Sequence, residues 1–267
     1  MDTSIVDFKK PPVNEVVCGV AFRDIQNYTS PHMGLFWSLV RDDFPIAEVK
    51  PLLAPPGSEL TIEITDVPPA PRYFLRSEDH SELIQLQANR FLYNWVRTET
   101  KPEYPRYRRV IRRFNKLRGL FETFLERHDL GPMSIRELRL TYVNHIAQGE
   151  GWSTPADIDK VFPAFRFKQR GCRYLTAPVG WNFVTQFPVR HKDSRLEVSI
   201  RTGSKQVADG KEQLLFILQL TVIGNIVDPS AAQTRAWFNM AREAIDLSFL
   251  DLTNTKVQTE VWGIHEY

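Results

Sequence analysis

The stretch that decides the fold is residues 83–118, LIQLQANRFLYNWVRTETKPEYPRYRRVIRRFNKLR. Its first part alternates in polarity as far as Val96 and predicts one long β-strand, while residues 107–128 have the apolar spacing of an amphipathic helix. Pro102 and Pro105 lie between the two and force an extended connection before the helix can begin. The predicted helix is about 33 Å long, which is enough to cross a whole sheet.

The same stretch is strongly basic. Residues 90–118 contain ten Lys and Arg residues and two acids, a local net charge of +8, whereas the whole chain has +2. A basic outcrop on a mildly acidic body indicates a surface that binds an anionic partner. Most of the cations fall on the side of the helix opposite to its apolar stripe. The candidate residues for binding nucleic acid or a partner protein are Arg97, Arg106, Arg108, Arg109, Arg112, Arg113 and Lys116, with Tyr93 and Trp95 as stacking groups.

The predicted strand has two different faces. One face is apolar and typical of a core, and the other begins with amides and ends with Phe91, Tyr93 and Trp95. The second face suits stacking and hydrogen bonding to bases or to a peptide. The alternative is that the aromatics pack under the helix of the other half of the chain, with the amides making hydrogen bonds between sheets. In either case we expect Trp95 to cluster with Tyr104 and Tyr107 where the strand ends, fixing the direction of the basic helix.

The composition is that of a soluble globular protein, because 42% hydrophobic and 25% charged residues leave ample material for a core. The longest apolar run, LLFILQLTVIG from Leu214, is too short to span a membrane and predicts a buried strand. The first residues, MDTSIVDFKKPP, have no apolar segment typical of a secretory signal. We therefore expect a cytoplasmic protein, in which Cys18 and Cys172 are reduced thiols.

The rest of the chain predicts a repeated order of elements. The first half has a strand at 14–22, a helix at 33–44, strands at 60–65 and 71–77, and then the long strand and helix. The second half has a strand at 134–146, a short helix at 154–165 with Thr154 as N-cap, and strands at 179–189, 195–203 and 213–224 before a helix at 230–250. Four apolar helix positions match at a constant offset of 124 residues: Phe114, Leu117, Phe121 and Leu125 with Phe238, Ala241, Ile245 and Phe249.

This order predicts an α+β fold. We interpret it as a degenerate duplication of a β-α-βββ-α unit, with antiparallel sheets each crossed by a long helix. The halves are residues 1–132, which carry the basic helix, and residues 133–267, and we expect them to form one compact pseudo-duplicated unit.

The sequence contains no recognisable catalytic or metal-binding motif. None of the six histidines lies at metal-ligand spacing, and HExxH, CxxC, a Walker loop and GxSxG are all missing. We therefore expect no catalytic residue, no metal and no cofactor. Asn144 and His145, at the end of a strand, form a candidate polar site. They could orient a substrate or a water molecule, or they could anchor the turn to Gly149.

Several motifs resemble an uncharacterised prokaryotic protein family that is sporadically distributed. They are the NW-R of residues 94–97, the YPRY of residues 104–107 and the strand ELRLTYVNHI of residues 137–146. The resemblance covers essentially the whole chain, although the last helix lacks the histidine expected early in it. It implies no active site. The patchy distribution resembles that of genes in mobile or defence islands, which implies a partner, antitoxin or accessory subunit.

Three functions follow from these observations. The leading hypothesis is a non-enzymatic interaction or regulatory subunit that acts with a partner protein, encoded nearby, in prokaryotic defence or toxin–antitoxin control. The alternative is a nucleic-acid-binding protein that uses the basic helix 106–118. A further alternative is a small-ligand-binding protein of helix-grip type, with a cavity lined by Trp181, Phe183 and Phe187. None of the three involves a membrane.

Overall fold

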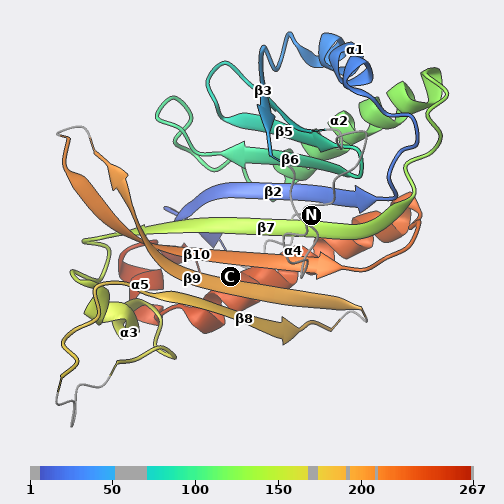
Figure 1. Ribbon diagram of the computed structural model, residues 1–267. Coiled ribbons are helices and arrows are strands. Elements are labelled where there is room, and N and C mark those ends of the chain that lie inside the picture. Colours follow the sequence, from blue (N-terminus) through green and yellow to red (C-terminus); the bar gives the residue numbers. More distant parts are fainter. Residues whose placement is uncertain (1–6, 52–70, 168–173, 191–192, 208–209, 266–267) are drawn as a thin grey trace. The chain divides into compact units, whose positions relative to one another are not determined.

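The computed structural model describes residues 7–51, 71–167, 174–190, 193–207 and 210–265. Nine of the strands form one sheet, and helices accompany them, so the predicted α+β class is confirmed (Figure 1). No helix in these ranges is long and apolar enough to cross a membrane.

The chain divides into two compact units, and each is discontinuous in sequence. Unit 1 consists of Met1–Glu15, Arg139–Gly224 and Ala231–Tyr267, and unit 2 of Val16–Leu138 and Asn225–Ser230. The sequence predicted the contiguous halves 1–132 and 133–267. The N-terminal residues belong to unit 1 because β1 (Asp7–Phe8) pairs with β11 (Ile264–His265) and Phe8 packs against Phe249 and Trp262.

Unit 2 holds most of β2 and four further strands, in the order β3-β4-β5-β6-β2 (Figure 1). Neighbouring strands from β3 to β6 are antiparallel. The bounds of the strands are Val13–Phe22 for β2, Ile46–Lys50 for β3, Arg72–Arg76 for β4, Glu82–Gln87 for β5 and Arg90–Val96 for β6. β3 was not predicted from the sequence, and the strand predicted at 60–65 lies outside the described residues.

The long strand predicted across residues 82–96 is wrong, because this segment is the β5–β6 hairpin with Ala88 and Asn89 in the turn. Its register pairs Leu86 with Phe91 and Ile84 with Tyr93. Residues directly opposite each other in an antiparallel pair share a face of the sheet. The aromatics of β6 therefore join the apolar face of β5 instead of forming a separate polar-aromatic face.

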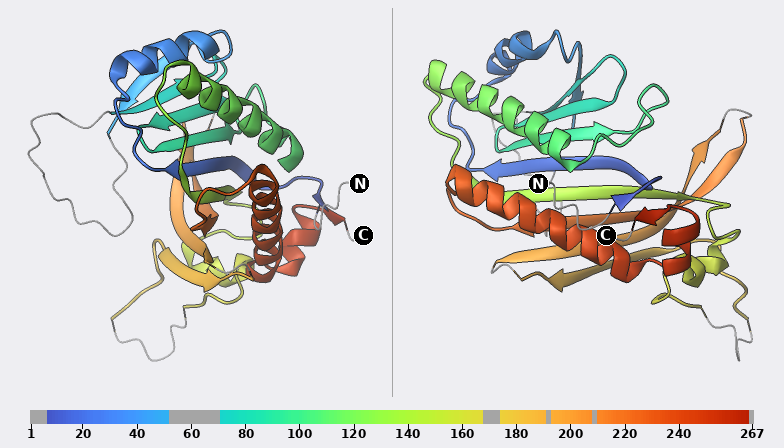
Figure 2. Two further views of the ribbon diagram at one scale, coloured as in Figure 1. Left: turned by 90° about the vertical axis from the view of Figure 1, so that its right-hand side faces the viewer. Right: turned by 180° about the vertical axis from the view of Figure 1, so that it is seen from behind.

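Two helices cover this apolar face of unit 2. They are α1 (Ser30–Val40) and α2 (Tyr107–Arg127), which lie side by side (Figure 2). Phe121 of α2 packs on Phe36 of α1 at 5.1 Å and on Phe91 of β6 at 5.5 Å between ring centroids. The helix predicted at 33–44 begins earlier, because Thr29 forms a capping box that starts α1 at Ser30.

Unit 1 contains the strand order β7-β10-β9-β8, and β10 with β9 and β9 with β8 are antiparallel. The predicted strands are confirmed, with bounds Ile135–Ala147 for β7, Asn182–Pro188 for β8, Ser194–Gln206 for β9 and Glu212–Gly224 for β10. Helix α4 (Ala231–Leu252) lies along β10, with Trp237 and Phe238 buried (Figure 2).

The described part of unit 1 also contains two shorter helical segments. The predicted helix at 154–165 consists of a 3₁₀ turn, η1 (Pro155–Asp157), and α3 (Ile158–Val161), and Thr154 is its N-cap in a capping box with Asp157. Hydrogen bonds from Lys160 and from the Thr154 backbone lower the pKa of Asp157 to about 2. Helix α5 (Thr255–Glu260) follows α4, with Asn254 as its N-cap. Cys18 is a buried free thiol, and Cys172 lies outside the described residues.

Candidate functional site

The connection between β6 and α2, residues 97–106, is held against the end of the hairpin. The rings of Trp95 and Tyr104 lie 5.4 Å apart, and Trp95 and Tyr107 are both buried. The predicted packing of Trp95 on Tyr104 is therefore confirmed, and the predicted place of Tyr107 in the same cluster stays a prediction. Arg106, the last residue before the helix, has a φ of 69°, a left-handed conformation that is uncommon outside glycine. The connection thus turns sharply into α2.

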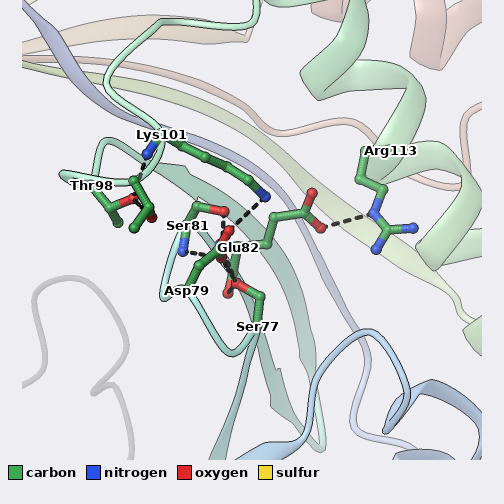
Figure 3. A network of polar contacts seen from close by, with 8 residues as sticks. Ser77, Asp79, Ser81, Glu82, Thr98, Lys101 and Arg113 are labelled. Atoms are coloured by element: carbon green, nitrogen blue, oxygen red, sulfur yellow. Dashed lines mark hydrogen bonds and ion pairs between the residues drawn. The ribbon is translucent and has the colours of Figure 1, made fainter.

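Asp79, in the turn between β4 and β5, contacts this connection through Lys101 (Figure 3). Its carboxylate accepts hydrogen bonds from Ser77 Oγ at 2.8 Å and from Ser81 Oγ at 2.7 Å, and it forms an ion pair with Lys101 Nζ at 2.6 Å. Burial pushes the pKa of Asp79 up, but the hydrogen bonds outweigh burial and hold the pKa below its ordinary value. The charged carboxylate therefore fixes Lys101, and Lys101 fixes the connection.

A second polar network crosses from β5 to α2 (Figure 3). Arg113 donates from Nε to Glu82 at 2.9 Å and from a terminal nitrogen to Asp43 at 2.9 Å. The Tyr93 hydroxyl bonds to Glu82 as well, and burial, followed by the charge of Glu82, raises the pKa of Tyr93 well above its ordinary value. Arg113 was predicted to bind a ligand, but its guanidinium is already engaged in joining α2 to the sheet.

A pocket of about 550 Å³ lies between these two networks, and all of its lining residues belong to unit 2. Its wall combines aromatic, proline and charged side chains. The residues that define its chemistry are Trp95, Lys101, Glu103, Tyr104, Arg109 and Arg113. Three of these lining residues are cations. Lys101 and Arg113 form ion pairs with carboxylates, whereas Arg109 has no ion-pair partner among the described residues.

The outer side of α2 forms a basic face, which we define as the exposed residues Arg108, Arg109, Arg112 and Lys116. At 100° per residue these four side chains fall within an arc of about 100°. Between Arg106 and Arg118 the sequence contains no acid, and within the described residues Arg109, Arg112 and Lys116 have no ion-pair partner. Arg109 belongs to both the basic face and the pocket, so the two are continuous.

Most of the remaining predicted binding residues are less exposed to a ligand than the basic face is. Tyr93 is 2% and Trp95 4% exposed, so neither presents a ring face on an open surface, although both line the pocket. Arg97 is half-buried, and Arg106 is exposed at the start of α2. Lys101, Glu103 and Tyr104 were not among the predicted binding residues. The KPEYP segment could have indicated them, because its prolines hold charged and aromatic residues in place.

The candidate polar site of Asn144 and His145 lies elsewhere, in unit 1. Asn144 is buried on β7 and donates from its side chain to the Leu218 carbonyl of β10 at 3.3 Å. The His145 backbone N–H donates to the Pro12 carbonyl at 2.9 Å. These bonds join strands and segments of unit 1 and do not involve the turn at Gly149, so both roles suggested for this pair stay predictions.

The aromatics proposed to line a small-ligand cavity are also in unit 1. Trp181 and Phe183 stack at 5.2 Å, and the Trp181 indole N–H donates to the Pro155 carbonyl. Phe187 is 45% exposed at the end of β8.

Among the described residues, no group of three or more His, Cys, Asp or Glu side chains could hold a metal ion. Comparison with known proteins gives no match to a family model, to a curated protein or to a solved structure. The resemblance drawn from the sequence motifs therefore stays a prediction, and the function has to be argued from the site.

Proposed function

We propose that this chain is a non-enzymatic nucleic-acid-binding protein, and that the basic face of α2 contacts the phosphate backbone. The observation that carries the proposal is the exposure of four cations on one side of a rigid helix, with no acid between them. Guanidinium groups match phosphate geometry, and Arg and Lys side chains are among the groups that bind nucleic-acid backbones.

Nucleic acid is favoured over an acidic protein because this surface has no apolar centre. Protein interfaces place aromatic and aliphatic side chains in the middle of a polar rim. On α2, Leu120 is the one large hydrophobic residue that is exposed among those described, and only to 36%. Nucleic-acid interfaces are more polar and much more positively charged, which fits the basic face.

The test is fluorescence anisotropy with labelled single-stranded and duplex DNA of one sequence at low salt. We expect the triple variant Arg108→Ala, Arg112→Ala, Lys116→Ala to lose at least about tenfold in affinity, or 1.4 kcal/mol. A matched control removes the same charge from exposed cations outside α2: Arg23→Ala, Arg41→Ala, Arg235→Ala. Absent binding at low salt, or equal losses in both triple variants, would refute the proposal.

A regulatory subunit that acts with a partner protein is the second candidate, and a different observation favours it. β8 is the last strand in the order of unit 1 and exposes Val184 to 70% and Phe187 to 45%. An edge strand with exposed apolar side chains can pair with a strand of another protein. The proposed setting is prokaryotic defence or toxin control, and co-purification of the untagged chain with the products of adjacent genes is the test.

We further propose that the two units arose by duplication of a β-α-βββ-α unit. Support comes from the constant offset of 124 residues between the apolar positions of α2 and α4. In each unit these residues form the buried side of the long helix. Within the described residues, unit 2 has one strand more than this order, because β3 precedes β4.

A further inference from the structure

We infer that the pocket of unit 2 takes up one unpaired nucleotide of a single strand whose backbone lies on the basic face of α2. This inference rests on the proposed function and deepens it, because it selects single-stranded over duplex nucleic acid. The link between the two surfaces is Arg109, which belongs to both.

The size and wall of the pocket fit a nucleotide. A volume of about 550 Å³ lies within the range of roughly 300–1,000 Å³ that small-molecule sites have. Tyr104 is half-buried and lines the pocket, with Trp95 behind it at 5.4 Å. Aromatic rings of this kind stack on bases of any sequence.

The charges of the pocket set the orientation of the nucleotide. Glu82 and Glu103 line it; Glu82 is ion-paired with Arg113, whereas the exposed carboxylate of Glu103 repels a phosphate. Lys101 is held by Asp79, and Arg113 by Glu82 and Asp43. The phosphate is therefore directed to Arg109 at the rim, next to the basic face, and the uncharged base is directed inward to Tyr104.

The wall of the pocket is also preorganised for binding a base. Pro102 and Pro105 restrict the connection that carries Tyr104, and the Lys101–Asp79 ion pair and the Trp95–Tyr104 contact hold it against the hairpin. A base in a duplex is stacked and paired inside the helix, so it cannot enter such a pocket without being extruded. A single strand has no such barrier.

The experiment measures binding of one labelled DNA sequence as single strand and as duplex to wild type, Tyr104→Leu and Tyr104→Phe. We expect wild type to prefer the single strand at least about fivefold. Tyr104→Leu should lower single-strand affinity by about 5- to 140-fold, the range given by base–aromatic stacking, and should leave duplex affinity within about twofold. Tyr104→Phe keeps the ring and should bind like wild type.

A second readout uses a single strand that contains the fluorescent base 2-aminopurine. Its emission should change on binding to wild type and Tyr104→Phe and stay unchanged with Tyr104→Leu, provided that the melting temperatures agree. If Tyr104→Leu does not fold, the inference is tested by two other results: the preference of wild type for the single strand over the duplex, and the change in 2-aminopurine emission on binding to wild type and Tyr104→Phe.

The outcomes separate the two proposals. If wild type binds neither probe, the proposed function fails. If it binds both probes equally, and the basic-face variant loses affinity for both, the proposed function stands and the pocket inference is overturned. A Tyr104→Leu protein that binds the single strand as wild type does would overturn the inference as well.

Discussion

Trp95 illustrates how one residue joins the sheet to the site. It lies opposite Glu82 in the hairpin, is 4% exposed, and contacts Tyr104 in the connection. We expect Trp95→Ala to lower the free energy of unfolding by about 3–5 kcal/mol, the range for a large buried aromatic. Chemical denaturation measures this loss. Leu35→Ala, at an exposed position of α1, is the control and should change stability by less than about 0.5 kcal/mol. A Trp95→Ala protein as stable as wild type would show that the ring has no structural role.

Individual side chains also show what the sequence alone could not reveal. Arg112 and Arg113 are neighbours of the same type, and both were predicted to bind a ligand. Arg112 is exposed, whereas Arg113 is held by Glu82 and Asp43, which are 31 and 70 residues away in the chain. The partners of a cation in an ion pair depend on the tertiary fold, and the helical spacing places the two arginines only about 100° apart. The spacing therefore identified the basic face but could not exclude Arg113 from it.

At the scale of elements, the long periodic segments were predictable and the short ones were not. Helices α2 and α4 and strands β7, β9 and β10 lie close to their predicted positions because each repeats its pattern over many residues. The β5–β6 hairpin was missed because its turn, Ala88-Asn89, has no glycine and the alternation continues through it. β3 was missed because its five residues, IAEVK, are too few to show a clear alternation of polar and apolar side chains.

Helix α4 carries an acid whose titration should affect stability. Burial raises the pKa of Asp246 to about 6, although Arg242 opposes the shift at 3.3 Å. Because the folded-state pKa lies above the ordinary value of 3.8, the folded protein holds this proton more tightly than the unfolded chain does. The group therefore contributes stability below about pH 4 and loses it as the pH rises through about 6.

We expect the stability of wild type relative to Asp246→Asn to fall on the order of 2–3 kcal/mol between about pH 4 and pH 7, at about 1.4 kcal/mol per pKa unit. Urea denaturation across this range measures the difference. A difference that is constant with pH would contradict the assignment.

For the whole molecule, the distribution of charge matters more than its sum. Residues 90–118 carry +8 in a chain of net charge +2, so the other residues are acidic overall. Net charge this small gives little general attraction to nucleic acid, so the proposed binding depends on local contacts. The sequence could locate this outcrop because the cations are close together in the chain. It could not locate the pocket, because Ser81 and Glu82 meet Lys101 and Tyr104 only through the hairpin and its connection.

The salt dependence of binding measures these local contacts directly. Five exposed cations of α2 and its first flanking residue could each neutralise one phosphate. They are Arg106, Arg108, Arg109, Arg112 and Lys116. The slope of log affinity against log salt should then be near −3.5 on single strands, at about −0.7 per contact, and near −4.5 on duplex DNA. In the basic-face triple variant two cations remain, so the single-strand slope should fall to about −1.4. Anisotropy titrations at four salt concentrations measure both slopes, and the triple control variant outside α2 should keep the wild-type value. An unchanged slope in the basic-face variant would place the phosphate contacts elsewhere on the molecule.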